Sequence, residues 1–108
     1  MPADLRLSQI QADDETPDPG ASVNTTFGIF NYGDEANSGH EICLLTFVAP
    51  DMSELYREDI AVHPIEPGHN QTMHRTFTMG HMPGEYEITL HCGGDATRLH
   101  VDVTGDAV

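Results

Sequence analysis

Residues 85 to 92 read E-Y-E-I-T-L-H-C, and this stretch decides the fold class. Apolar and polar residues alternate along it, with the apolar face made by Tyr86, Ile88, Leu90 and Cys92. A period of two residues is that of a β-strand with one buried face. The preceding T-M-G-H-M-P-G, 78–84, adds Met and His to the Cys and so also suggests a copper site. The two interpretations lead to different proteins.

Six further segments have the character of short strands and are separated by breaks rich in Gly, Pro, Asn and Asp. They are 4–10, 22–30, 41–48, 59–65, 72–79 and 97–103. Helical periodicity is nearly absent; only 50–59 predicts a turn or two of helix, with Asp51 or Ser53 as its cap. The pattern therefore predicts an all-β protein, an immunoglobulin-like antiparallel β-sandwich of about seven strands, with residues 1–108 as a single domain.

The charge balance is the strongest signal in the composition. Eighteen Asp and Glu oppose four Arg, and the formal net charge is −14. The acidic residues run from Asp4 to Asp106, so we expect them to coat the folded surface. Such a surface repels phosphate backbones and anionic lipid heads, which argues against nucleic-acid and membrane partners. Abundant acid without any Lys favours a salt-loving source, because molar salt shortens the screening length to about 3 Å.

No segment reads as a membrane anchor or an export signal. The start M-P-A-D-L-R lacks a basic segment followed by an apolar run. The longest apolar stretch, residues 42–50, is far too short to cross a bilayer.

The turn motifs resemble those of the CARDB-type domains, which are immunoglobulin-like modules of bacterial and archaeal surface proteins. The matching pieces span nearly the whole chain: Asp4-Leu5, Pro19-Gly20, Asn31-Tyr32-Gly33, Pro67-Gly68 and Pro83-Gly84-Glu85-Tyr86. The resemblance implies a sandwich fold and a non-enzymatic role in adhesion, spacing or assembly. It rests on turn chemistry and therefore supports fold more than function.

From this resemblance and the charge we expect a structural or interaction module rather than an enzyme. The favoured role is an accessory or decoration subunit of a larger assembly, such as the virion of a halophilic archaeal virus. The alternative is an adhesion or spacer domain of a cell-surface protein, so the expected location is a virion or a cell surface. Expected partners are other proteins of the assembly or further copies of the chain. The predicted contact residues lie in 31–39 and 50–59: Asn31, Tyr32, Asp34, Glu35, Asn37, Leu55 and Tyr56.

The two cysteines admit two interpretations. The immunoglobulin-like arrangement makes the third and sixth strands antiparallel neighbours, so Cys43 and Cys92 would lie opposite each other. They would then form a disulfide, or remain as two buried free thiols if the chain works in a reducing compartment.

A cupredoxin-like metal protein is the second alternative. A blue-copper site needs two His, one Cys and a distant Met, and the available set is His40, Cys92 and His100 with one Met. The spacing is poor, because His100 lies in mid-strand and no Met follows Cys92. A looser site would use His74, Met79, His81 and Met82. The simpler interpretation is that the Met fill the core and the His lie on turns and outer faces, so no cofactor is expected.

Signatures of catalysis are missing. The chain has no G-x-S-x-G, no H-E-x-x-H and no phosphate-binding Gly loop. We therefore expect no enzymatic activity.

Overall fold

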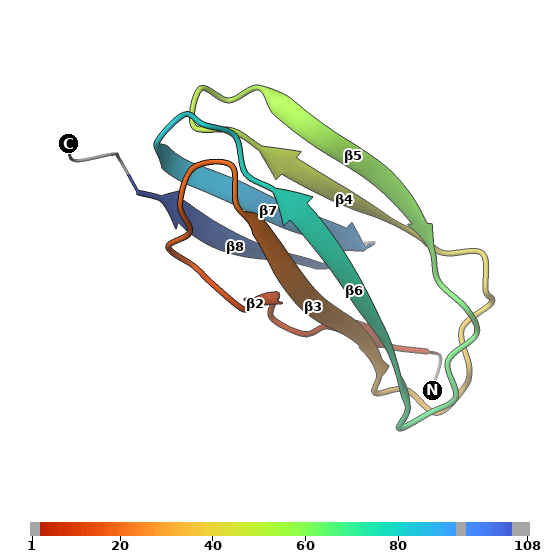
Figure 1. The fold of residues 1–108 in the computed structure, drawn as a ribbon. Coiled ribbons are helices and arrows are strands. Elements are labelled where there is room, and N and C mark those ends of the chain that lie inside the picture. Colours follow the sequence, from red (N-terminus) through yellow and green to blue (C-terminus); the bar gives the residue numbers. More distant parts are fainter. Residues whose placement is uncertain (1–2, 93–94, 105–108) are drawn as a thin grey trace.

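The computed structural model describes residues 3–92 and 95–104, and within them two antiparallel sheets pack face to face (Figure 1). The first sheet contains β1 (Leu5–Leu7), β2 (Gln11–Ala12), β3 (Ser22–Asn31) and β6 (Asn70–Thr78), with β3 at its centre. The second sheet has the order β5 (Glu54–Ala61), β4 (Ile42–Val48), β7 (Gly84–Cys92), β8 (Asp95–Val103). The predicted all-β, immunoglobulin-like sandwich is confirmed.

The core lies between the sheets and follows the alternation read from the sequence. Val23, Phe27 and Ile29 of β3 are fully buried and face Ile88 and Leu90 of β7 across the interface between the sheets. Each such side chain contributes about 1.5–3 kcal/mol through removal of apolar surface from water. Larger rings fill the middle of the sandwich, where Phe47 packs against Phe77 and Tyr86 with ring centroids 5.0 and 5.6 Å apart.

Two of the three Pro-Gly pairs, Pro19-Gly20 and Pro67-Gly68, form turns, as their composition predicts, and the third leads directly into β7 at Gly84. Gly20 and Gly68 have φ angles of +77° and +80°, a region that residues with a Cβ rarely adopt. The preceding prolines fix their own φ and so favour the same turns.

The prediction of a helical turn at 50–59, and of a strand only at 59–65, is wrong. Residues 49–53 form a tight turn in which Met52 N donates to Ala49 O, and β5 begins at Glu54. The Asp51 carboxylate accepts hydrogen bonds from the amide and hydroxyl of Ser53. The same Asp and Ser chemistry that caps helices also stabilises turns, which explains the error.

The side of the sandwich between β5 and β6 is closed by an ion pair. Arg75 of β6 donates two hydrogen bonds of 2.9 Å to Glu58 of β5. The Arg75 guanidinium holds the pKa of Glu58 below its usual value, and Tyr56 donates to the same carboxylate. Charges that point inward beside an edge strand oppose pairing with a further strand, so this ion pair protects both edges from aggregation.

The two cysteines lie opposite each other on neighbouring strands. The β4–β7 register pairs Cys43 with Cys92, their Cα atoms are 4.4 Å apart, and a disulfide joins them. Among the described residues, no helix has the length and apolar character needed to span a membrane.

Reduction of the disulfide is expected to lower the free energy of unfolding. The bridge closes a loop with a sequence separation of 49, which corresponds to about 4 kcal/mol in the chain-entropy model. Urea unfolding with and without reductant measures the difference, and thiol titration of the denatured protein checks the redox state. Two titratable thiols in protein purified without reductant would contradict the bridge.

Replacement of Met52 by Gly is expected to stabilise the fold by roughly 1 kcal/mol. Met52 has a φ of 72°, which is costly for a side chain of this size and not for Gly. The control is Met82→Gly, because Met82 is also exposed but has no positive φ. The denaturant midpoints of the two variants and the wild type measure the change in stability. Equal changes in the two variants would contradict the strain at Met52.

Candidate ligand-binding face

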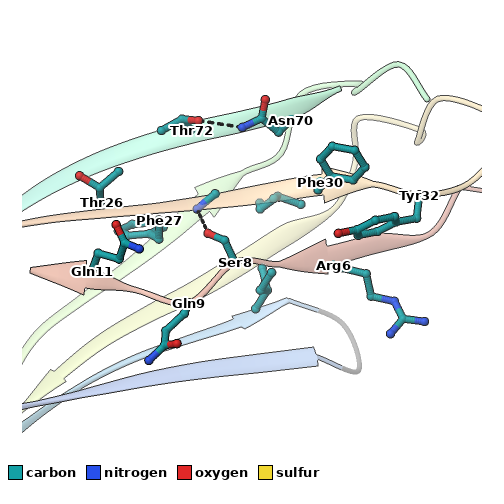
Figure 2. Close-up of a pocket in the computed structure, with 13 residues that line it drawn as sticks. Arg6, Ser8, Gln9, Gln11, Thr26, Phe27, Phe30, Tyr32, Asn70 and Thr72 are labelled. Carbon is teal, nitrogen blue, oxygen red and sulfur yellow. Dashed lines mark hydrogen bonds between the residues drawn. The ribbon is translucent and has the colours of Figure 1, made fainter. Parts of the chain in front are cut away.

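The edge of the first sheet contains a β-bulge between β1 and β2. Leu7 pairs with Ile29 and Gln11 pairs with Thr26, so three residues on one strand, 8–10, oppose two on the other, 27–28. The extra residue changes which side chains face inward. Ser8 and Gln9 are both exposed, while Ile10 is buried. The bulge thus turns Ser8 toward Gly28, while Gln9 points to the opposite side (Figure 2).

Gly28 faces the bulge from β3 and leaves a hollow beside it. Ser8 N donates to Gly28 O over 2.9 Å, and Gly28 N donates to Ser8 Oγ over 2.7 Å. The hollow has a volume of about 370 Å³. A Cβ at Gly28 would lie 3.3 Å from Gln71 O, 3.5 Å from Ser8 Oγ and 3.9 Å from Asn70 Nδ2. The absence of a side chain at this position therefore keeps the hollow open.

The lining of the hollow is rich in amides and hydroxyls (Figure 2). Its polar side chains come from the bulge, β2, β3 and β6: Ser8, Gln9, Gln11, Thr26, Asn70 and Thr72. Asn70 Nδ2 donates to Thr72 Oγ1 over 2.9 Å, which orients both groups along β6. The lining contains no His, Cys, Asp or Glu.

Two aromatic rings and one arginine bound the hollow at the β1 end (Figure 2). The rings of Phe30 and Tyr32 have centroids 4.3 Å apart, and 64% of the Tyr32 surface is exposed. Arg6 donates to Asp4 over 2.9 Å, and the Asp4 carboxylate raises the pKa of the guanidinium. The arginine is therefore paired, and the site as a whole has little net charge.

The outward-facing residues of β3 and β6 include no Asp or Glu. We call this set the acid-free face, and its members are Ser22, Asn24, Thr26, Gly28, Phe30, Asn70, Thr72, His74, Thr76 and Thr78. The outer face of the second sheet, in contrast, carries Asp59, Glu85, Glu87 and Asp102. At the margins of the first face, the Asp13 carboxylate accepts hydrogen bonds from Asn24, and Asp4 is paired with Arg6.

Two of the predicted contact residues in 31–39 are structural. Asn31 is fully buried and its amide donates to Glu35 O and Ile65 O, so it ties the loop after β3 to the loop after β5. Asn37 is also buried, and its carbonyl accepts from Ile65 N over 2.6 Å. The expectation that these two side chains contact a partner is therefore wrong, because their polar atoms are used within the fold.

The other predicted contact residues are exposed but lie apart. Tyr32, Asp34 and Glu35 are exposed at the end of the sandwich where β3 finishes. Leu55 and Tyr56 lie on β5 of the other sheet, and the Tyr56 ring packs edge-on against Phe77. Of these five, only Tyr32 lines the hollow.

The candidate metal ligands do not come together. Met79 is in the core, and His74 bonds to Thr26 in the middle of β6. His81 lies seven residues farther along, beyond the strand end, and Met82 is exposed in the same turn. The sulfur of Cys92 is in a disulfide, and His100 contacts Glu87, so the set His40, Cys92 and His100 has no free thiolate. No cluster of three His, Cys, Asp or Glu suited to a metal occurs within 3–92 and 95–104.

Apart from Tyr32, the lining residues of the hollow were not singled out by the sequence, although one signal was present. Inward-facing apolar residues fall at Leu5 and Leu7, then at Ile10 and Ala12. This change from odd to even positions is the mark of a bulge within what reads as one strand, 4–10. Asn70 and Thr72 line the hollow because β6 pairs with β3. No local pattern in the sequence indicates this pairing.

Comparisons with known proteins bear on the fold alone. No family model and no curated protein matches the chain. Among solved structures, it is similar to a cycloisomaltooligosaccharide glucanotransferase from Paenibacillus sp., with a TM-score of 0.76, 20% identity, and coverage of 96% of this chain and 15% of that chain. It is also similar to a β-glucosidase from Erythrobacter marinus, with a TM-score of 0.68, 13% identity, and coverage of 94% of this chain and 16% of that chain. For an alkylpurine DNA glycosylase from Pseudomonas fluorescens, the TM-score is 0.69, the identity is 10%, and the match covers 95% of this chain and 31% of that chain. The chain thus spans less than a third of each.

The loop after β3 is expected to make stability depend on pH. Hydrogen bonds from Asn37, and then from Ser38 and Gly39, lower the pKa of Glu41 from 4.5 to about 2. A depressed carboxyl pKa stabilises the fold above the unfolded-state pKa, and this contribution disappears as pH falls through about 2. The difference in unfolding free energy between wild type and Glu41→Gln should therefore be largest near neutral pH and shrink between pH 4.5 and 2.

Urea unfolding at a series of pH values measures this difference. The matched control is Glu66→Gln, which removes an exposed carboxylate from another loop. A difference between wild type and Glu41→Gln that stays constant down to pH 2 would contradict the hydrogen-bonded state of Glu41.

Proposed function

We propose that this chain is a non-catalytic interaction module that binds its partner through the acid-free face. The observation that carries the proposal is the distribution of charge. Eighteen acidic residues are spread along 108 positions, yet none lies among the outward-facing residues of β3 and β6. An acidic coat of this kind repels acidic neighbours, so a face without it is the region where contact costs least.

The chemistry of the face supports binding and not catalysis. The Ser8 hydroxyl accepts a hydrogen bond from Gly28 N, and no general base lies beside it in the hollow. Hydroxyl-activating chemistry needs an adjacent base within hydrogen-bond reach. Amides, hydroxyls and aromatic rings, in contrast, are the groups that hold a ligand without transforming it.

The favoured role remains an accessory subunit of a larger assembly, with a virion of a halophilic archaeal virus as the example. One observation favours the alternative of an adhesion or spacer domain. Leu5 pairs with the end of β3 and Val103 pairs with the start of β7, so the described chain enters and leaves at opposite ends of a body 57 Å long (Figure 1). This geometry suits modules joined in line.

An acidic residue placed on the acid-free face is expected to weaken binding, because its carboxylate would be buried without a partner at the contact. We predict that Thr72→Glu reduces co-sedimentation of the purified chain with envelope fragments or virus particles of the source organism at least tenfold in molar KCl. The matched control is Ala96→Glu, which adds the same charge to an exposed position on β8 of the other sheet.

Retention on particles would favour the accessory subunit, and retention on envelope fragments would favour the adhesion module. Equal retention of the two variants would contradict the proposed face, as would a wild-type chain that sediments with neither preparation.

A further inference from the structure

We infer that the hollow between the bulge and Gly28 binds an uncharged glycan. This inference rests on the proposed function and names the ligand of the same face. Three observations support it. The hollow is lined by amides, hydroxyls and aromatic rings, these groups have little net charge together, and the space between them is open.

The polar groups suit hydroxyls that both donate and accept hydrogen bonds. Side-chain amides carry donors and an acceptor on one rigid plane, and a sugar hydroxyl matches this pair of roles. Within the described residues, the side-chain amide of Gln11 forms no hydrogen bond to the protein and lines the hollow. Asn70 uses one donor on Thr72 and keeps its carbonyl. These amides are therefore available to a ligand.

The aromatic rings suit the apolar faces of sugar rings. Tyr32 is 64% exposed and packs beside Phe30, so the two rings form a platform at one end of the polar lining. A large exposed ring with a polar tip gives contact area at low cost in conformational entropy. A pyranose presents C–H groups on its faces and hydroxyls at its rim. Its face would pack on the Tyr32 and Phe30 platform, and its hydroxyls would reach the side-chain amides of the lining.

Other ligand classes fit less well. The only charged side chain in the lining, Arg6, is paired with Asp4, and the molecule as a whole carries −14, so phosphates and other anions are disfavoured. An apolar ligand would leave the side-chain amide of Gln11 without a partner, which is costly. The volume of about 370 Å³ lies at the lower end of the range for small-ligand sites, about 300–1,000 Å³.

Binding of an uncharged ligand would also depend little on salt concentration, which agrees with the salt-loving source expected from the composition. Hydrogen bonds and ring contacts do not depend on attraction between charges over distance, and molar salt shortens the screening length to about 3 Å. Binding at this site is therefore expected to change less than twofold between dilute buffer and molar KCl.

The test is isothermal titration calorimetry with a panel of neutral oligosaccharides: those derived from cellulose, xylan, mannan, laminarin, amylose and chitin. We expect at least one to bind, and Tyr32→Ala to weaken that binding at least tenfold by removal of the platform. Gly28→Thr should abolish it by filling the hollow, with a shift of a few tenths of an ångström at Gln71 O, which would lie 3.3 Å from the new Cβ. Ala96→Thr, which adds the same side chain to the other sheet, should bind as wild type does.

Several outcomes would overturn the inference: no binding of any neutral oligosaccharide, stronger binding of the anionic oligogalacturonate, or equal affinities for wild type, Tyr32→Ala and Gly28→Thr. Thermal unfolding of each variant shows that loss of binding is not loss of the fold. If no sugar binds but Thr72→Glu still reduces co-sedimentation, the proposed glycan ligand is wrong and the proposed interaction face is supported. If Thr72→Glu also has no effect on co-sedimentation, both proposals are wrong.

Discussion

Electrostatic repulsion from a net charge of −14 is the constraint on which the surface of this molecule depends. Acidic residues occupy the outer face of β7 and the loops at the ends of the sandwich, whereas the outward positions of β3 and β6 carry Thr, Asn, Ser and His. If the acidic residues served only to keep the chain soluble in salt, they would be expected on the outer faces of both sheets. The distribution is explained if that sheet has a partner.

The hollow on this sheet results from two departures from a regular strand pair. The bulge at 8–10 turns Ser8 toward Gly28, and the absence of a side chain at Gly28 leaves the space beside Ser8 open. A bulge and a strand glycine both weaken a sheet. The disulfide between Cys43 and Cys92 and the dense core of the second sheet supply stability elsewhere, so the edge can remain irregular.

The sequence predicted those features that depend on local patterns. Alternation located β7 and its buried face, and the Pro-Gly pairs located turns. The segment 50–59 was misread because Asp51 and Ser53 serve turns and helix caps alike. Asn31 looked like a surface loop residue, and its burial results from carbonyl groups of Glu35 and Ile65 that only the folded chain brings near. The proposed binding face depends on the register between β3 and β6, which is set by long-range packing and has no local signal in the sequence.

We propose that the outer face of β3 and β6, with the adjoining bulge, is a recognition surface. The decisive measurement is amide-resolved NMR of the uniformly labelled wild-type chain, titrated with the best-binding neutral oligosaccharide. We expect chemical-shift changes confined to residues 6–11, 26–32 and 70–74, with the amide of Gly28 among the largest. Changes centred on β5, on β8 or on the turn at 79–83 would contradict it.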